Sequence, residues 1–272
     1  MIIGNKKFDT KNNVYIMGIL NITPDSFSDG GKYDTLDQAL FRAEKMIKDG
    51  ASIIDIGGES TRPGHIQISD DEEINRVMPV LEKLKSNFDI PLSLDTYKSN
   101  VVLAVKDKID LVNDIWGLKY DPKMASAIAK IGLPCCIMHN RNDSNYTNFW
   151  EEFISDINES INLARAAGIK DENIMIDGGV GFAKSYEQNL SVMNRTDELC
   201  NLGFPVLVAT SKKRVIGTST DKTVDQRTIG TVATTVVGVM KGASFIRVHD
   251  IDENWDAIKM TKCIMEEKKW IP

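Results

Sequence analysis

The sequence predicts a single (β/α)₈ barrel domain that spans residues 1–272. Eight short apolar runs each end in a polar residue, and most are followed by a segment with the 3.6-residue apolar period of an amphipathic helix. The runs recur at intervals of about 18 to 40 residues, and a chain of about 250 residues is typical of this fold. In such a barrel the active site lies at the C-terminal ends of the strands, so the polar residues that end the runs are the first candidates for function.

The predicted strands begin with an N-terminal segment and each of the eight runs ends at a polar residue. Residues 1–13 are expected to form a short strand or turn that closes the bottom of the barrel. The polar residues that end the eight runs are Asn21, Asp55, Asp95, Asn113, His139, Asp177, Ser211, and Arg247 together with His249. Each of these alone could be a simple helix N-cap, but eight together favour a site.

Helical patterns lie between the runs. Residues 36–47, 153–164 and 232–240 repeat apolar side chains at helical spacing, and each pattern stops at a glycine. Ser69 and Glu72 match a capping box ahead of a further helix over residues 74–84. Pro79 lies inside this last pattern and is expected to kink the helix.

The loop after the first run, NITPDSFSDGG at residues 21–31, is rich in small polar residues and glycine. Its few apolar side chains repay little of the entropy that ordering would cost. A loop of this kind at a strand end is more often an active-site cover than a structural turn. We therefore expect residues 23–31 and 60–65 to be mobile in the free protein and to order when a first substrate binds.

Composition excludes several classes of protein. The net charge of −6 argues against a general nucleic-acid binder, and no apolar run approaches the roughly 18 residues that a membrane span needs. The N-terminal residues lack the order of a signal peptide. Four cysteines without C-x-x-C spacing (Cys135, Cys136, Cys200, Cys263) are expected to be reduced core residues of a cytoplasmic protein.

Two other motifs do not predict a site. Residues 178–185, GGVGFAKS, differ by one residue from the phosphate-binding loop G-x-x-x-x-G-K-[ST], but Ala183 stands where that loop needs a glycine. The three histidines, His65, His139 and His249, have no second His or Cys at ligand spacing, so a zinc site is not expected. A lone histidine at a strand end is more often a hydrogen-bonding residue.

The strand-end residues suggest a ligand. Asp95, Asn113, Asp177 and Lys213 combine carboxylates, an amide and an ammonium, a set that suits a polar planar molecule with fixed donors and acceptors. On a different part of the rim, the residues Asn21, Arg62, Arg247 and His249 are expected to form an anion-binding region. A heterocycle that bears a phosphate or diphosphate is the ligand that these two groups predict.

Two long motifs, ILNITPDSFSDGG at residues 19–31 and GASIIDIGGESTRPG at residues 50–64, resemble the signatures of the dihydropteroate synthase family. The similarity continues in family order at residues 94–96, 112–115, 138–139, 177–184, 211–213 and 247–250. It implies that the chain joins 6-hydroxymethyl-7,8-dihydropterin diphosphate to 4-aminobenzoate, releases diphosphate and works as a homodimer. Ala183 and Ala209 replace glycines that are usual in this family, and Lys212 replaces a common arginine.

The resemblance also implies roles for individual residues. Asp95, Asn113, Asp177 and Lys213 would hold the pterin, with Met138 against its flat face. Asn21 would bind a Mg²⁺ ion that accompanies the diphosphate, and Arg247 and His249 would bind the diphosphate oxygens. Asp95, Lys213, Arg247 and His249 would carry the catalysis. The aminobenzoate would be enclosed by Phe27, Thr61, Arg62, Pro63, Phe182 and Ser211.

Two alternatives remain open at this point. One is a pterin-dependent methyltransferase that acts with a corrinoid protein, which would share the pterin-binding residues. It would have no use for Asn21, Arg247 and His249 around a diphosphate. The other is a non-catalytic paralogue that binds pterin, against which the intact loop motifs argue.

Overall fold

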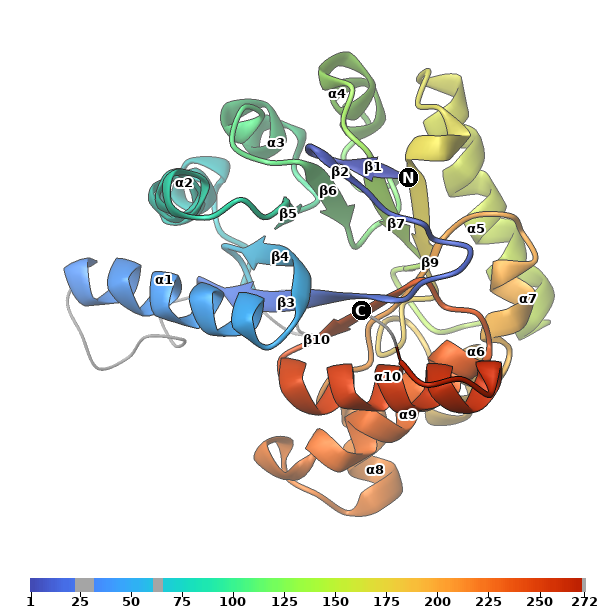
Figure 1. Ribbon diagram of the computed structural model, residues 1–272. Helices are drawn as coiled ribbons and strands as arrows, with labels where there is room; N and C mark the ends of the chain where they lie inside the picture. The colour runs from blue at the N-terminus through green and yellow to red at the C-terminus, as the bar shows by residue number, and fades with distance from the viewer. Residues whose placement is uncertain (23–31, 61–65, 271–272) are drawn as a thin grey trace.

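Eight parallel strands form a closed barrel in the computed structural model, which describes residues 1–22, 32–60 and 66–270, with only the backbone at residues 32–35 (Figure 1). The strands are β3 (Tyr15–Asn21), β4 (Ala51–Gly57), β5 (Leu92–Asp95), β6 (Leu111–Asp114), β7 (Cys135–Met138), β8 (Ile174–Asp177), β9 (Val206–Val208) and β10 (Phe245–Val248). Each strand pairs with the next along the chain, and β10 pairs with β3 to close the ring. The predicted (β/α)₈ barrel is therefore confirmed.

Helices surround the barrel and connect its strands (Figure 1). They are α1 (Lys32–Lys48), α2 (Asp70–Asn87), α3 (Ser99–Val105), α4 (Met124–Ile131), α5 (Phe149–Ala166), α6 (Tyr186–Asn194), α7 (Thr196–Cys200), α8 (Arg214–Thr220), α9 (Thr228–Met240) and α10 (Ile251–Glu266), with short 3₁₀ turns at Asp171–Asn173 and Val224–Gln226. The helix α2 continues through Pro79. Of the two hydrogen bonds in the predicted capping box, the one from the backbone N–H of Glu72 to the Ser69 side chain is present. The Glu72 carboxylate pairs with Arg76 instead of returning to Ser69.

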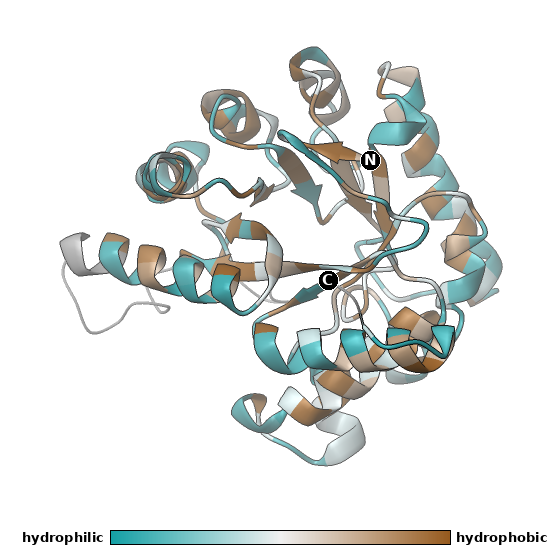
Figure 2. Ribbon diagram, viewed as in Figure 1, coloured by the Kyte–Doolittle hydropathy of each residue, from teal (hydrophilic) through white to brown (hydrophobic). Residues whose placement is uncertain are grey.

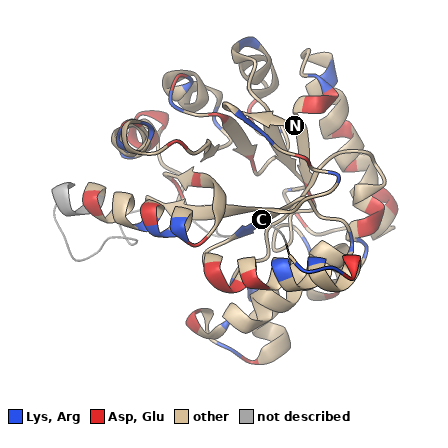
Figure 3. Ribbon diagram, viewed as in Figure 1, with Lys and Arg blue, Asp and Glu red and all other residues tan. Residues whose placement is uncertain are grey.

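Each strand buries both of its faces. The outward side chains, such as Ile54 and Ile56, pack against apolar helix residues such as Val77 and Leu81. Figure 2 shows mostly brown barrel strands, with β10 partly teal, inside helices of mixed colour. Figure 3 shows positive and negative residues interspersed on the helices. The inward side chains form a second apolar layer that includes one residue from most strands: Met17, Ile53, Leu111, Cys136, Met175, Leu207 and Phe245.

A short N-terminal hairpin closes the bottom of the barrel, as predicted. Its strands, β1 (Ile2–Ile3) and β2 (Lys6–Lys7), are antiparallel. Ile3 and Phe8 are buried in the inner layer, and the Phe8 ring centroid lies 4.8 Å from that of Tyr15 and 5.8 Å from that of Phe245. The opposite end of the barrel is where the strand-end polar residues lie.

The cysteines fit the prediction in part. Cys135 and Cys136 are buried, but Cys200 and Cys263 are only partly buried, so the expectation of four core cysteines is wrong for these two; all four are free thiols. Across the part of the chain that the structure describes, no helix has the length and apolar character needed to cross a membrane.

Candidate active site

The polar residues predicted from the strand ends meet at one mouth of the barrel. Side chains alternate along a strand, so the residue two positions after an inward apolar side chain also points inward. Asp55 follows Ile53 in this way, Asn113 follows Leu111, Asp177 follows Met175 and Arg247 follows Phe245. Because all eight strands are parallel, these inward polar residues share the C-terminal mouth.

A buried cluster of two carboxylates and an arginine occupies this mouth. Arg247 donates from Nε to Asp55 Oδ2 at 2.6 Å and from Nη2 to Asp95 Oδ2 at 2.5 Å. Asn113 donates from Nδ2 to the same Asp55 oxygen at 3.2 Å. Burial raises the pKa of Asp95 to about 7, an effect that Arg247 opposes and Asp55 increases. Asp55 Oδ1 and Asp95 Oδ1 are buried acceptors with no hydrogen-bond partner among the described residues, so a ligand with N–H donors would satisfy them.

This cluster corrects the predicted grouping of Arg247. The sequence suggested that Arg247 lies with Asn21 and His249 on a part of the rim separate from Asp95. The structure instead joins the Arg247 guanidinium to Asp95, and joins His249 to Ser211, whose Oγ lies 2.8 Å from His249 Nδ1. The side-chain period places Arg247 and His249 on one face, but it cannot say that a long arginine side chain turns towards the carboxylates across the barrel.

Asp177 and Lys213 form the second charged group of the mouth. Asp177 Oδ1 accepts from the backbone N–H of Gly179 at 2.8 Å, and Lys213 Nζ donates to the carbonyl of Val180. Burial lowers the pKa of Lys213 to about 8, although Asp177 and Asp95 oppose this effect, and burial raises the pKa of Asp177. Gly179 is required at its position, because a Cβ there would lie 2.0 Å from the carbonyl oxygen of His139 and its φ is +63°.

An apolar platform adjoins the charged groups. Tyr97, Ile115 and Met138 form a buried cluster, against which Trp116 and Phe182 pack as partly buried residues. Met138 and Phe182 were predicted site residues, whereas Ile115 was missed, and so was Asp55 as the partner of Arg247 and Asn113. Both had a signal in the sequence: Ile115 stands two residues after Asn113, and Asp55 ends an apolar run.

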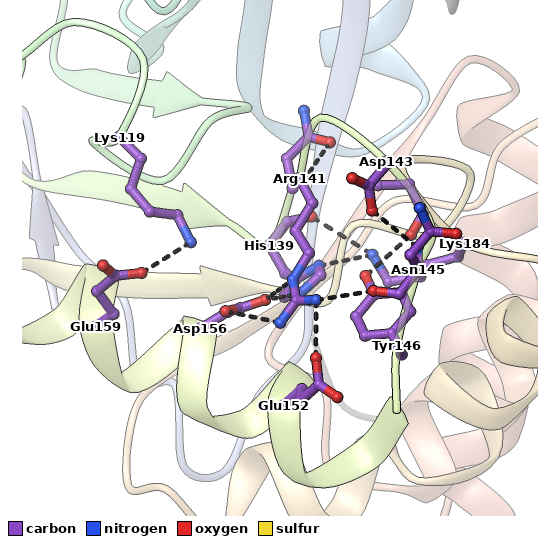
Figure 4. A network of polar contacts seen from close by, with 12 residues as sticks. Lys119, His139, Arg141, Asp143, Asn145, Tyr146, Glu152, Asp156, Glu159 and Lys184 are labelled. Carbon is purple, nitrogen blue, oxygen red and sulfur yellow. Dashed lines mark hydrogen bonds and ion pairs between the residues drawn. The ribbon is translucent and has the colours of Figure 1, made fainter. Parts of the chain in front are cut away.

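The loop at residues 178–185 nearly matches a phosphate-binding loop in sequence, but its backbone groups face the opposite way. Lys184 Nζ lies 3.0 Å from the carbonyl oxygens of Gly179 and Phe182 and 2.8 Å from His139 Nδ1 (Figure 4). The loop thus turns carbonyl groups, not N–H groups, towards its lysine, so it lacks the donors that would cradle a phosphate. His139 is a hydrogen-bonding residue, as expected for a lone strand-end histidine, and its Nε2 lies 2.9 Å from Asp156 Oδ2.

Four predicted site residues lie outside the described residues. They are Phe27, Thr61, Arg62 and Pro63. The prediction that residues 23–31 and 60–65 are mobile in the free protein falls on the same segments, apart from the described Ser60, and stays a prediction.

Comparison with known proteins identifies the family. The sequence profile of the pterin-binding enzymes matches residues 17–249. The dihydropteroate synthase of Clostridium beijerinckii is 52% identical over 267 residues, which cover 97% of this chain and 99% of that one. The dihydropteroate synthase of Bacillus subtilis is 49% identical over 94% of this chain and 90% of its own.

Solved structures agree with this assignment. A dihydropteroate synthase from Clostridium difficile, determined in the presence of pteroic acid, has a TM-score of 0.92 and 49% identity over 95% of this chain and 99% of its own. The Yersinia pestis dihydropteroate synthase in complex with a sulfonamide drug has a TM-score of 0.91 and 38% identity over 98% of this chain and 99% of its own. This chain therefore belongs to the dihydropteroate synthase family of pterin-binding enzymes.

Proposed function

We propose that this barrel joins 6-hydroxymethyl-7,8-dihydropterin diphosphate to 4-aminobenzoate, giving 7,8-dihydropteroate and diphosphate. The observation that carries the proposal is the buried arrangement at the mouth. There Asp55, Asp95 and Arg247 form one charged group, and Asp177 and Lys213 form the other. These groups offer acceptors and donors in fixed positions next to an apolar platform, which is what a flat heterocycle with N–H edges requires.

The pterin is assigned to the deepest polar residues. Asp177 would accept from the amino and N–H edge of the ring, and Lys213 would donate to the opposite edge. Asn113 and Asp95 would complete the contacts to the ring nitrogens, while Met138 would cover its face. The raised pKa of Asp177 and the lowered pKa of Lys213 both arise from burial, so a ligand that restores their hydrogen bonds would bind strongly.

The chemical step is loss of diphosphate before the new carbon–nitrogen bond forms. The electron-rich dihydropterin spreads the positive charge that develops when the carbon–oxygen bond breaks, and the Asp95 carboxylate would stabilise that charge. Arg247 engages Asp55 and Asp95 through Nε and Nη2, so we assign its Nη1 to a diphosphate oxygen, together with His249. The arylamine of 4-aminobenzoate would then attack the carbon, and its proton would pass to the released diphosphate or to water.

We assign a magnesium ion to the space beside this cluster. The side chain that Gly57 lacks leaves a small space, because a Cβ at Gly57 would lie 3.6 Å from Asn21 Oδ1 and 3.9 Å from Asp95 Oδ2. The described residues hold no group of three or more His, Cys, Asp or Glu suited to a metal, but Mg²⁺ with a diphosphate needs only one or two protein oxygens. Asn21 would hold the ion, which when bound supplies charge that stabilises the leaving diphosphate.

The aminobenzoate is assigned to the outer part of the mouth. Phe182 would stack on its ring, and Ser211 would receive its carboxylate, with Phe27, Thr61, Arg62 and Pro63 closing the site. Excluding water there would protect the cationic pterin from hydrolysis.

A turnover assay tests this function. Diphosphate release should require both substrates and Mg²⁺. Release with the pterin substrate alone, at the same rate as with 4-aminobenzoate, would contradict the synthase assignment. Methyl transfer to a corrinoid protein without diphosphate release would support the methyltransferase alternative, and ligand binding without any turnover would support the non-catalytic one.

We also propose that the enzyme is a cytoplasmic homodimer. The outer faces of α9 and α10 expose large apolar side chains: Ile229, Met240, Met260 and Ile264 are each at least 60% exposed. Such a patch on two helices that pack against each other suits a second copy of the chain. Sedimentation equilibrium would measure the subunit number. The four free cysteines suit a reducing compartment.

A further inference from the structure

The loop that carries Phe182 is fixed by contacts that the proposed reaction does not use. Ala183, the next residue, has a φ of +44°, in the left-handed region that residues with a side chain disfavour. A non-glycine residue keeps this conformation only where its surroundings hold it. Two hydrogen bonds to backbone carbonyl groups hold the conformation of Ala183. The Phe182 oxygen accepts from Lys184 Nζ at 3.0 Å, and the Ala183 oxygen accepts from Tyr146 Oη at 2.9 Å.

Tyr146 belongs to the loop between β7 and α5, which is held by a chain of charged groups (Figure 4). Arg141 donates from Nε to Asp156 Oδ2 at 2.5 Å, from Nη2 to Asp156 Oδ1 at 3.2 Å and from Nη1 to Glu152 Oε2 at 2.9 Å. Its guanidinium carbon lies 4.3 Å from the centroid of the Tyr146 ring. Arg141 therefore fixes the ring of Tyr146 from one side while its carboxylate partners come from α5.

The same chain of groups reaches Lys184. Asp156 accepts from His139 Nε2, so the neutral imidazole presents the lone pair of Nδ1 to Lys184 Nζ at 2.8 Å. Burial lowers the pKa of His139 to about 4, although Asp156 opposes this effect, so the ring is neutral near pH 7. The backbone around Phe182 is thus tied to the β7–α5 loop twice, through Tyr146 directly and through Asp156, His139 and Lys184.

We propose that Tyr146 and Arg141 are positioning residues that fix Phe182 and thereby set the affinity for 4-aminobenzoate. This rests on the proposed function, in which Phe182 stacks on the aminobenzoate ring. Asp177 belongs to β8, which pairs with β7 and β9, so its position depends on the barrel more than on Tyr146. Lys213 contacts the loop only at Val180 and at the Phe182 ring, so we expect pterin binding to change less than aminobenzoate binding.

Tyr146→Phe is the sharpest test, because it removes one hydroxyl and keeps the ring beside Arg141. We expect the KM for 4-aminobenzoate, and the Kd of a sulfonamide measured with pterin and diphosphate present, to rise about fivefold, the effect of one lost hydrogen bond. The Kd of the pterin ligand alone should stay within about twofold. Tyr15→Phe is the matched control, since its hydroxyl also bonds to one backbone group, the N–H of Asp9, at the closed end of the barrel.

A double-mutant cycle separates positioning from general stability. In a Phe182→Ala background, Tyr146→Phe should cause no further loss of aminobenzoate affinity, because Tyr146 acts through the Phe182 ring. Additive losses, or equal losses for pterin and aminobenzoate, would overturn the proposal. So would an unchanged KM in the single variant.

Hydrogen exchange keeps this proposal distinct from the proposed function. The backbone amides of residues 179–184 should exchange faster in Tyr146→Phe than in the unaltered protein, without any substrate present. Unchanged exchange would sink the positioning role alone. Faster exchange in Tyr146→Phe, together with no turnover of the two substrates by the unaltered protein, would sink the proposed function alone.

Discussion

The Arg247 guanidinium lies between two buried carboxylates, so the mouth of the barrel contains its own counter-ions before a ligand binds. With all three groups ionised, Asp55, Asp95 and Arg247 carry a net charge of −1 in a region of low dielectric. Burial raises the pKa of Asp95, Arg247 opposes this effect and Asp55 adds to it. The net negative charge is suited to a ligand that becomes cationic during the reaction.

The ionisation of Asp95 should control activity near neutral pH. Its pKa is raised from an ordinary 3.8 to about 7, so the carboxylate that would stabilise the cation is lost as the pH falls through about 7. We expect kcat/KM for the pterin substrate to fall about tenfold per pH unit below that value. Between the two pKa values the folded chain binds more protons than the unfolded chain, so this group's contribution to stability decreases as the pH rises towards 7.

The variant Asp55→Asn tests whether Asp95 is the titrating group. Asp55→Asn removes the neighbouring carboxylate that raises the pKa of Asp95, so the midpoint of the pH–rate profile should move to lower pH. If the profile reported an ionisation of the substrate instead, its midpoint would be the same in Asp55→Asn and in the unaltered enzyme. Identical midpoints in the two enzymes would show that Asp95 is not the group observed.

Asp177→Asn should weaken pterin binding by about 2–4 kcal/mol. The substitution keeps the shape of the side chain, and Oδ1 can still accept from Gly179, but an N–H₂ group then faces a ligand edge that also donates. Calorimetry with a pterin ligand measures the effect, with the exposed Asp107→Asn as control. An unchanged Kd would remove Asp177 from the pterin site.

Gly57→Ala should separate the metal from the pterin. Its new Cβ would have ordinary contact distances to Asn21 and Asp95, so the fold should tolerate it, yet it fills the space assigned to Mg²⁺. We expect the Mg²⁺ concentration for half-maximal activity to rise about tenfold, with pterin affinity unchanged. EDTA should abolish the activity of the unaltered enzyme and added Mg²⁺ should restore it; a chelator-resistant enzyme would refute the assignment of Asn21.

At the scale of single residues, the sequence predicted which side chains lie at the mouth but not which of them touch. The polar residues that end the apolar runs were predicted to lie at one mouth, and Asp95, Asn113 and Asp177 do lie at the C-terminal ends of parallel strands. The pattern gave no information on the direction of a long flexible side chain, so the contacts of Arg247 with Asp55 and Asp95 were not predicted. A hydrogen bond between β4 and β10 joins residues 192 positions apart, and no local pattern encodes such a contact.

At the scale of helices and loops, the longest elements were the easiest to predict. Residues 153–164 and 232–240 lie inside α5 and α9, because several turns repeat the apolar period. The helices α3 and α8 have seven residues each, about two turns, and so give little periodic signal. The loop from β8 to α6 was misleading in a different way: its glycines and lysine resemble a phosphate-binding loop, but its shape depends on Tyr146 and His139, which come from elsewhere in the chain.

The backbone of that loop gives a stability prediction. Ala183→Gly should stabilise the protein by about 0.5–1 kcal/mol, since it relieves the left-handed strain at φ +44° but gives the unfolded chain more freedom. Ala209→Gly is the matched control, because its φ is not positive and it is buried; it should destabilise the protein. Urea unfolding measures both, and two changes of the same sign would show that the conformation at Ala183 is not strained.

At the scale of the whole molecule, the barrel topology predicts the order of binding. One end of the barrel is filled by Ile3 and Phe8, so both ligands must enter through the mouth, where we have assigned the pterin to the inner part and the aminobenzoate to the outer part. A sulfonamide, as a mimic of aminobenzoate, should therefore bind weakly alone and about 5- to 150-fold more tightly once pterin and diphosphate are bound. Calorimetric titration with and without those ligands measures this coupling; equal affinities would mean that the aminobenzoate site is preformed.

Because the lower end of the barrel is closed, a chemical probe of this enzyme can be attached to a support from only one end of the ligand. A linker on the pterin edge that we assign to Asp177 would have to pass through the apolar layer of Met17, Met175 and Phe245 and past the N-terminal hairpin. A linker on the carboxylate end of a bound product analogue would emerge through the open mouth instead. Affinity resins and fluorescent tracers for this protein should therefore be tethered at the benzoate end of the ligand, and the same compounds tethered at the pterin end should not retain it.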